Sequence, residues 1–196
     1  MGKRIGILGD IGSGKSIIAK QFGFPVFNAD EVVNKIYNKN RLCYKKLRNR
    51  LHKYVKSYPI NKKELSRAIL SNKNNLKIII NVVHPIVKKE MNLFIKNNKN
   101  KEMVILDIPL FVENKLNKKK DILIFVEAKR KDINKRLKKR INYNKKLIDN
   151  FRKIQKPLKF KKKLSTYIIK NNFKLITVKK NVKLIKDKIL YERNST

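Results

Sequence analysis

The fold is decided by residues 9–16, which read Gly9-Asp10-Ile11-Gly12-Ser13-Gly14-Lys15-Ser16 and match the full pattern G-x-x-x-x-G-K-[ST]. In such a loop the glycines allow successive backbone N–H groups to surround phosphate oxygens. Lys15 can reach the β and γ phosphates, and the hydroxyl of Ser16 can bind Mg²⁺. The segment therefore predicts a nucleotide-binding site. A dinucleotide-binding loop is excluded, because no third glycine follows Gly12 and Gly14 at the required spacing.

The residues around this loop predict a strand before it and a helix after it. Arg4–Leu8 is a short, mostly apolar run, and Ile17, Ile18 and Phe22 have helical spacing. Similar apolar runs predict strands at Pro25–Phe27, Met103–Leu106, Ile122–Val126 and Tyr167–Ile169. Helical patterns predict helices at Glu31–Tyr37, about Lys131–Ile141 and Val182–Tyr191. Strands that alternate with helices indicate an α/β fold with a parallel sheet, which binds ligands at the carboxyl ends of its strands.

The middle of the chain predicts helices only. Between residues 40 and 100 the apolar periodicity predicts four helices, at Leu42–Leu51, Lys63–Leu70, Leu76–Val83 and Pro85–Ile95. Pro85 is placed at the start of the last of these, where a missing N–H costs least. This part is expected to be a helical insertion in a nucleotide-binding core.

The charge of the chain is strongly basic, with 52 Lys and Arg against 14 Asp and Glu, a formal net charge of +38. Such an excess can indicate a nucleic-acid partner. Here the charge is spread from Lys3 to Arg193 and accompanies abundant Asn and Ile and no Trp, which is the bias of an A/T-rich coding sequence. We interpret it as compositional drift and expect no specific nucleic-acid partner, only weak polyanion binding at low salt.

The sequence lacks the features of membrane-spanning, secreted, disulfide-bonded and zinc-binding proteins. No apolar run approaches the roughly 18 residues of a membrane-spanning helix, and the first residues do not resemble a signal peptide. One cysteine and two histidines, far apart, offer neither a disulfide framework nor the spacing of a zinc site. We therefore expect a cytoplasmic protein without a membrane partner.

Several further residues have two interpretations on pattern alone. Asp107 ends an apolar strand and could bind Mg²⁺ or simply form a turn. Asp30 follows the second strand and could be a general base or a helix cap. Arg136 and Arg140 lie four residues apart on one predicted helix face, which could cover phosphates or face solvent. His84 before Pro85 could belong to the turn that starts a helix.

Together these motifs resemble the dephospho-CoA kinase family, in its order and at its distances. The resemblance runs from about Gly6 to Asn172. It is carried by Gly6–Ser16, Asn28–Asp30, His84-Pro85, Asp107–Glu113, the Arg136 and Arg140 pair, Gln155 and Ile168–Asn171.

The resemblance implies a three-layer phosphate-loop kinase fold with a parallel sheet, a helical substrate-binding insertion and a lid. It implies a single kinase domain over residues 1–196, with a nucleotide-binding core at 1–39 and 101–196, a lid near 130–156 and a CoA-substrate insertion at 40–100. The implied reaction transfers the γ-phosphoryl group of ATP to the ribose 3'-hydroxyl of dephospho-CoA, with Mg²⁺, in a protein expected to be a monomer.

The resemblance also implies roles for individual residues. Asp30 would be the general base, and Arg140, with Lys15, would act on the transferring phosphate. The residues implied for ATP are Gly12, Ser13, Gly14, Lys15, Ser16 and Ile17, with Asn171 near adenine. Those implied for the acceptor are Asp30, Lys62, His84, Pro109, Leu110 and Glu113. The candidates for Mg²⁺, from the loop motif and from the end of a strand, are Ser16 and Asp107.

Four positions depart from the family pattern. Leu8 stands in place of Thr, Asp10 in place of Gly, Asn28 in place of the first Asp of an Asp-Ala-Asp triplet, and Lys62 in place of an Arg. Lys62 cannot make the bidentate contact of an arginine. The departures bear on rate and substrate affinity more than on the type of reaction. The alternative functions are another small-molecule or nucleoside monophosphate kinase and, more remotely, a basic nucleic-acid-binding protein.

Overall fold

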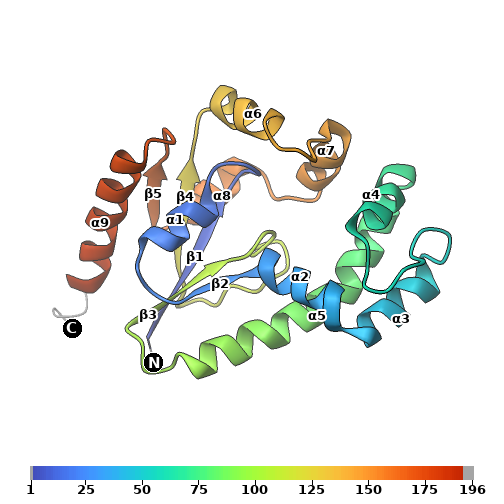
Figure 1. Ribbon diagram of the computed structural model, residues 1–196. Helices are drawn as coiled ribbons and strands as arrows, with labels where there is room; N and C mark the ends of the chain where they lie inside the picture. Colours follow the sequence, from blue (N-terminus) through green and yellow to red (C-terminus); the bar gives the residue numbers. More distant parts are fainter. Residues whose placement is uncertain (1, 192–196) are drawn as a thin grey trace. The chain divides into compact units, whose positions relative to one another are not determined.

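The computed structural model describes residues 2–191 and contains a parallel five-stranded sheet (Figure 1). Its strands are β1 (Lys3–Gly9), β2 (Val26–Asn28), β3 (Met103–Asp107), β4 (Ile122–Glu127) and β5 (Tyr167–Lys170). They follow the order β2-β3-β1-β4-β5, and every neighbouring pair is parallel. The strands and the α/β class predicted from the sequence are confirmed.

The helices lie between the strands, in the middle of the chain and after the last strand. They are α1 (Lys15–Gln21), α2 (Ala29–Lys39), α3 (Arg41–Arg50), α4 (Lys62–Ser71), α5 (Asn74–Asn97), α6 (Arg130–Lys138), α7 (Lys145–Lys153), α8 (Leu158–Leu164) and α9 (Leu175–Tyr191). Within residues 2–191, no helix combines the length and the apolar character needed to cross a membrane.

The chain divides into two compact units. One, the sheet unit, contains the residues up to Asn28, Asn98–Tyr143 and the residues from Gln155 onward. The other, the helical unit, contains Ala29–Asn97 and Asn144–Ile154. The helical unit begins earlier than residue 40, because α2 packs on α5, and it includes α7, expected in the lid, because α7 packs on α4.

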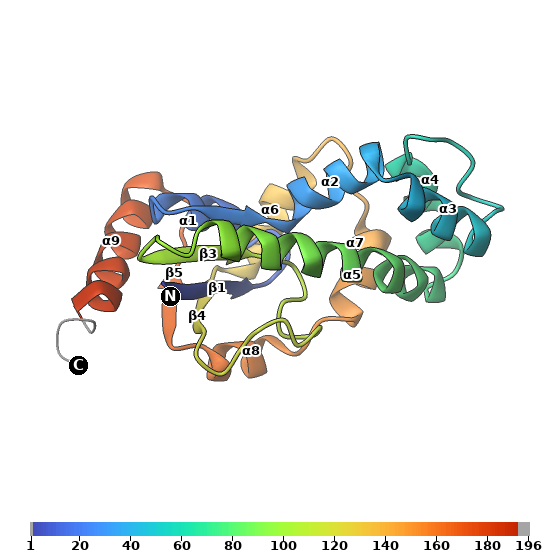
Figure 2. The same ribbon diagram turned by 90° about the horizontal axis from the view of Figure 1, so that it is seen from below.

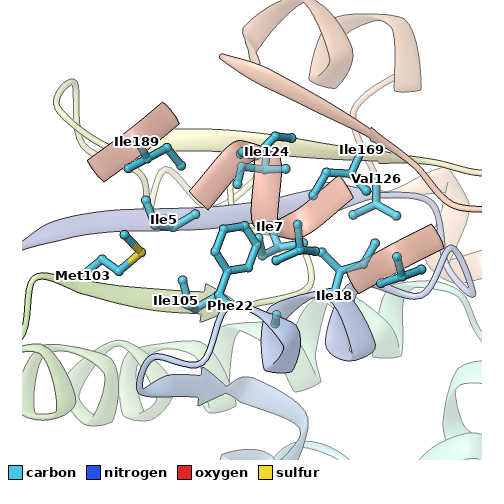
Figure 3. Packing of buried hydrophobic residues seen from close by; sticks show 14 residues of the cluster. Ile5, Ile7, Ile18, Phe22, Met103, Ile105, Ile124, Val126, Ile169 and Ile189 are labelled. Atoms are coloured by element: carbon cyan, nitrogen blue, oxygen red, sulfur yellow. The ribbon is translucent and has the colours of Figure 1, made fainter. Parts of the chain in front are cut away.

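The sheet unit has three layers. Helices α1 and α9 pack against each other and against the sheet, whereas α8 packs against β1 and β4. Figure 2 shows α1 and α8 on opposite faces of the sheet. Because both faces are covered, the central strands β1, β3 and β4 are mostly apolar and buried, and all five residues of β3 are buried. The main core lies between the sheet and the pair α1 and α9, where Phe22 meets isoleucines from β1, β3 and β4 (Figure 3).

Helix α5 corrects the prediction of two helices in this region, because it runs unbroken through Pro85. Val82 and Val83 before the proline and Val87 and Met91 after it are all buried. They form one apolar stripe, so packing outweighs the local preference of proline for a helix start. The interpretation of His84 as part of a turn is therefore wrong.

Helix boundaries also differ towards the end of the chain. Helix α9 begins at Leu175 rather than Val182, and the sequence analysis did not predict α7 or α8. Helix α6 ends at Lys138, short of the predicted Ile141, which is fully exposed. Once the next position of the apolar face has nothing to pack against, continuing the helix gains no burial.

The packing of α9 predicts different effects on stability for substitutions at two of its isoleucines. Ile189 is fully buried and Ile176 is 85% exposed. Replacing Ile189 by Ala is expected to lower the free energy of unfolding by about 2 to 5 kcal/mol, through lost burial and a cavity. The matched change Ile176→Ala should alter it by no more than about 0.5 kcal/mol. Urea denaturation checks both, and equal effects would contradict the assignment of α9 to the core.

Candidate functional site

The loop between β1 and α1 has the conformation that a phosphate-binding loop requires. Gly9, Gly12 and Gly14 have positive φ angles of 147°, 84° and 93°, a region that other residues rarely adopt. The ammonium of Lys15 donates to the carbonyl of Asp10 at 2.8 Å and to that of Gly9 at 3.3 Å. The lysine therefore lies folded over the loop, where it can reach phosphate oxygens.

Asn171 fastens this loop to the end of β5. Its side-chain Nδ2 donates to the carbonyl of Ser13 at 2.7 Å, and its Oδ1 accepts from the backbone N–H of Phe173 at 2.8 Å. A Cβ atom on Gly14 would lie 2.4 Å from Nδ2, so glycine is required there for this contact. The resemblance placed Asn171 near adenine; in the structure its side chain supports the phosphate loop.

Two acidic residues of the sheet unit, Asp10 and Asp107, are buried. Asp107 ends β3, and its Cα is paired in register with that of Asn28 at the end of β2. Asp10, where the family has Gly, accepts from the backbone N–H of Ile11 at 2.7 Å. The added carboxylate is thus held by the loop itself.

The segment after β3 is pressed against the central strand. A Cβ atom on Gly6 would lie 2.5 Å from the ring of Phe111, so the ring needs the bare backbone of glycine beneath it. Leu110 has a positive φ of 59°, which is uncommon for a residue with a side chain and stores strain. Its carbonyl accepts from the N–H and the side chain of Asn114, which closes the turn.

This segment and the phosphate loop share a cavity of about 10 Å³. The lining includes Lys15 and the predicted acceptor residues Pro109, Leu110 and Glu113. The structure therefore brings together the donor-side lysine and three of the predicted acceptor residues. Gln155 and Lys161 also line the cavity.

Three predicted acceptor residues lie in the helical unit. Asp30 is exposed in the first turn of α2, Lys62 is exposed at the start of α4, and His84 is half-buried within α5. A cap residue precedes the first helical residue, which here is Ala29, so the helix-cap interpretation of Asp30 is wrong. Asp30 follows Asn28, the last residue of β2, by two residues in the sequence.

The two arginines of the predicted lid do not share a helix face. Arg136 is on α6, but Arg140 lies beyond its end, and the N–H of Arg140 donates to the carbonyl of Leu137 as in a tight turn. The guanidinium of Arg136 lies 4.6 Å from the centre of the Phe173 ring, a cation–π contact. The prediction that Arg136 and Arg140 share a helix face is wrong, because α6 ends at Lys138, before Arg140.

Sequence reasoning missed Lys161 and Phe173 as residues of this site. Lys161 stands in the run Lys159–Lys163, where a buried lysine looks no different from its solvated neighbours. Phe173 follows two asparagines, and no local pattern indicates its contact with Arg136. Gln155 carried part of the resemblance but was given no role.

A family model described as dephospho-CoA kinase matches residues 3–176. The chain is 30% identical over 113 residues to the dephospho-CoA kinase of Bartonella quintana, covering 55% of this chain and 57% of that protein. It is 33% identical over 87 residues to the dephospho-CoA kinase of Coxiella burnetii, covering 42% and 44%. The chain thus spans about half the length of the curated relatives that it matches.

Solved structures give the same fold over nearly the whole chain. The Thermus thermophilus protein TT1252 superposes with a TM-score of 0.76 at 24% identity, covering 95% of this chain and 97% of that chain. Dephospho-CoA kinase from Campylobacter jejuni superposes with a TM-score of 0.60, with the same identity and coverage. Shikimate kinase from Acinetobacter baumannii gives 0.52 at 11% identity, covering 98% and 95%. At these identities the likeness establishes the phosphate-loop kinase fold.

Asn171 yields the first prediction for the site. Asn171→Ala removes the donor to the Ser13 carbonyl, and a hydrogen bond of this kind contributes about 0.5 to 1.5 kcal/mol. If the loop is held for nucleotide binding, ATP affinity should fall by up to about tenfold. The neighbouring change Asn172→Ala removes two exposed hydrogen bonds, to the Thr177 hydroxyl and from the Lys174 N–H, and should leave affinity unchanged. Isothermal titration calorimetry checks this, and equal affinities of the two variants would contradict the supporting role.

His84 yields a prediction about pH. Burial lowers the pKa of His84 below its ordinary value of 6.5, so the unfolded chain binds the imidazole proton more readily than the folded protein. The contribution of His84 to stability is therefore present above about pH 6.5 and lost as the pH falls. Between pH 7.5 and 5.5 the free energy of unfolding of His84→Asn should fall less than that of the wild type. His52→Asn, at an exposed histidine, should follow the wild type.

Proposed function

The chain belongs to the dephospho-CoA kinase family, and we propose that it transfers the γ-phosphoryl group of ATP to the 3'-hydroxyl of dephospho-CoA, giving CoA and ADP. The observation that carries this proposal is the cavity that Lys15 shares with Pro109, Leu110 and Glu113. It joins the phosphate loop to residues 109–113, which are among the most specific parts of the family resemblance. The named relatives support the same reaction.

On the donor side, residues 12–17 would hold the phosphates of ATP. The glycines turn backbone N–H groups towards the bound phosphates, and Lys15 exchanges its contacts with the Gly9 and Asp10 carbonyls for contacts with the β and γ phosphates. Asn171 keeps the loop in this shape through Ser13. Little covalent chemistry is needed from the protein, because phosphoryl transfer depends mainly on positioning and charge.

The hydroxyl of Ser16 and the buried carboxylate of Asp107 fit a site for Mg²⁺, which prefers oxygen ligands. Within residues 2–191 no three His, Cys, Asp or Glu side chains are grouped to hold a metal ion. Two protein oxygens, with phosphates and water, are the usual environment of Mg²⁺ in kinases. When bound, the ion would neutralise charge on the phosphates.

On the acceptor side, Asp30 would accept the proton of the attacking 3'-hydroxyl. Its exposed position in the first turn of α2 leaves the carboxylate accessible to a ligand. Lys62, His84, Pro109, Leu110 and Glu113 would bind dephospho-CoA, and Arg140, beyond the end of α6, would cover the phosphates. Arg136 is held by Phe173, which makes Arg140 the more available of the two.

The proposed function is tested by measuring ADP release with dephospho-CoA, AMP, CMP and shikimate as acceptors. We expect kcat/KM for dephospho-CoA to exceed that for each other acceptor by at least about 100-fold. Lys15→Met should abolish turnover and remain folded, whereas Lys20→Met, at an exposed lysine of α1, should be fully active. Preference for another acceptor, or a Lys15→Met enzyme within tenfold of the wild type, would overturn the proposal.

The role of Asp30 gives a separate prediction. Asp30→Asn should lower kcat by about 10² to 10⁴, the usual range for loss of a general base, and should leave ATP affinity unchanged. Glu31→Gln, the neighbouring exposed acid in the same helical turn, is the matched control. Steady-state turnover measures the effect on kcat, and equilibrium titration measures the effect on ATP affinity. An unaltered kcat in Asp30→Asn would exclude it as the base.

A further inference from the structure

Lys161 is the one buried lysine among residues 2–191, in a chain that carries 52 lysines and arginines. Its ammonium lies 2.8 Å from Oε1 of Glu113, and the two side chains are 3% and 8% exposed. It also donates to Oε1 of Gln155 at 3.2 Å. A buried ammonium without partners would strongly destabilise a protein. The position of Lys161 in α8 therefore depends on these two acceptors.

The two oxygens of Glu113 are used unequally. Oε1 accepts from the ammonium of Lys161 and from the backbone N–H of Lys156 at 2.9 Å. Oε2 is also buried but has no hydrogen-bond partner among the described residues. A buried acceptor without a donor costs stability. A carboxylate held firmly by one oxygen, with the other unused, indicates that a donor arrives with a ligand.

The place of this carboxylate indicates which ligand it serves. Glu113, Gln155 and Lys161 line the same cavity as Lys15 of the phosphate loop. Its volume of about 10 Å³ is close to that needed for one water-sized group. A group as small as a hydroxyl can enter this space, which is also lined by the lysine of the phosphate loop.

We propose that Lys161 is a positioning residue, which holds Glu113 through Oε1 so that Oε2 accepts a hydrogen bond from a hydroxyl group of the acceptor. The inference rests on the proposed function, because it takes the acceptor to be an alcohol. Lys161 itself does not touch the acceptor. Its effect on catalysis passes through Glu113, and Gln155 completes the support of the ammonium.

The test compares Lys161→Met and Lys161→Arg with Lys162→Met. Lys162 is the next residue of α8 and makes an exposed ion pair with Glu127 at 2.7 Å, so its variant removes the same charge outside the cavity. We expect Lys161→Met to raise KM for dephospho-CoA at least tenfold, with ATP affinity within twofold of the wild type. Lys161→Arg should restore KM to within about threefold, and Lys162→Met should match the wild type.

Glu113→Gln provides a second route that keeps the shape of the side chain, and it serves as the test if Lys161→Met does not fold. It should raise KM for dephospho-CoA at least tenfold at unchanged ATP affinity. The double variant with Lys161→Met should be no worse than the more affected single variant, because both changes remove one arrangement.

Two outcomes would overturn the inference while the wild type phosphorylates dephospho-CoA. One is a Lys161→Met protein with a lower melting temperature but unchanged KM for the acceptor, which would leave a purely structural ion pair. The other is a double variant whose loss equals the product of the two single losses, which would mean that the residues act independently. A wild type that does not use dephospho-CoA would instead contradict the proposed function.

Discussion

Parallel pairing of β1 with both β3 and β4 is the constraint on which the site depends. Because the strands point the same way, their carboxyl ends lie along one edge of the sheet. The phosphate loop follows β1 at that edge, Asp107 ends β3, and Asn171 follows β5. A strand paired in the opposite direction would carry its loop to the far edge. The strands thus place the phosphate loop, Asp107 and Asn171 along one edge of the sheet.

The sequence predicts the parts of this arrangement that depend on neighbouring residues. The glycine loop, the strands and the helical middle all have local patterns, and the structure confirms them. Contacts between distant residues have no such pattern. Asn171 reaches Ser13 across 158 positions, and the buried Lys161 depends on Glu113 and Gln155, which accept from its ammonium. Pro85 and Arg140 were misplaced for a related reason, since packing decides whether a helix continues past a proline or ends early.

Most of the positive charge lies at the surface, and the buried cations are paired with carboxylates. Arg4 and Lys161 are the buried cations of residues 2–191, and each has a carboxylate oxygen within 3.0 Å. Burial raises the pKa of Asp121, the partner of Arg4, while the Lys118 N–H and the Arg4 charge act in the opposite direction. Both carboxylates, Glu113 and Asp121, belong to the connection between β3 and β4. That connection is therefore tied at one end to β1 and at the other to α8.

The unbroken course of α5 has a mechanical consequence. Pro85 has no N–H to donate to the carbonyl of Asn81, so the ladder of hydrogen bonds along the helix lacks one rung near its middle. The helix consists, in this sense, of two stiff rods joined at a compliant point. Bending concentrates at such a point, and His84 is the residue immediately before it. The helix is therefore continuous through Pro85 but less stiff there than along the rest of its length.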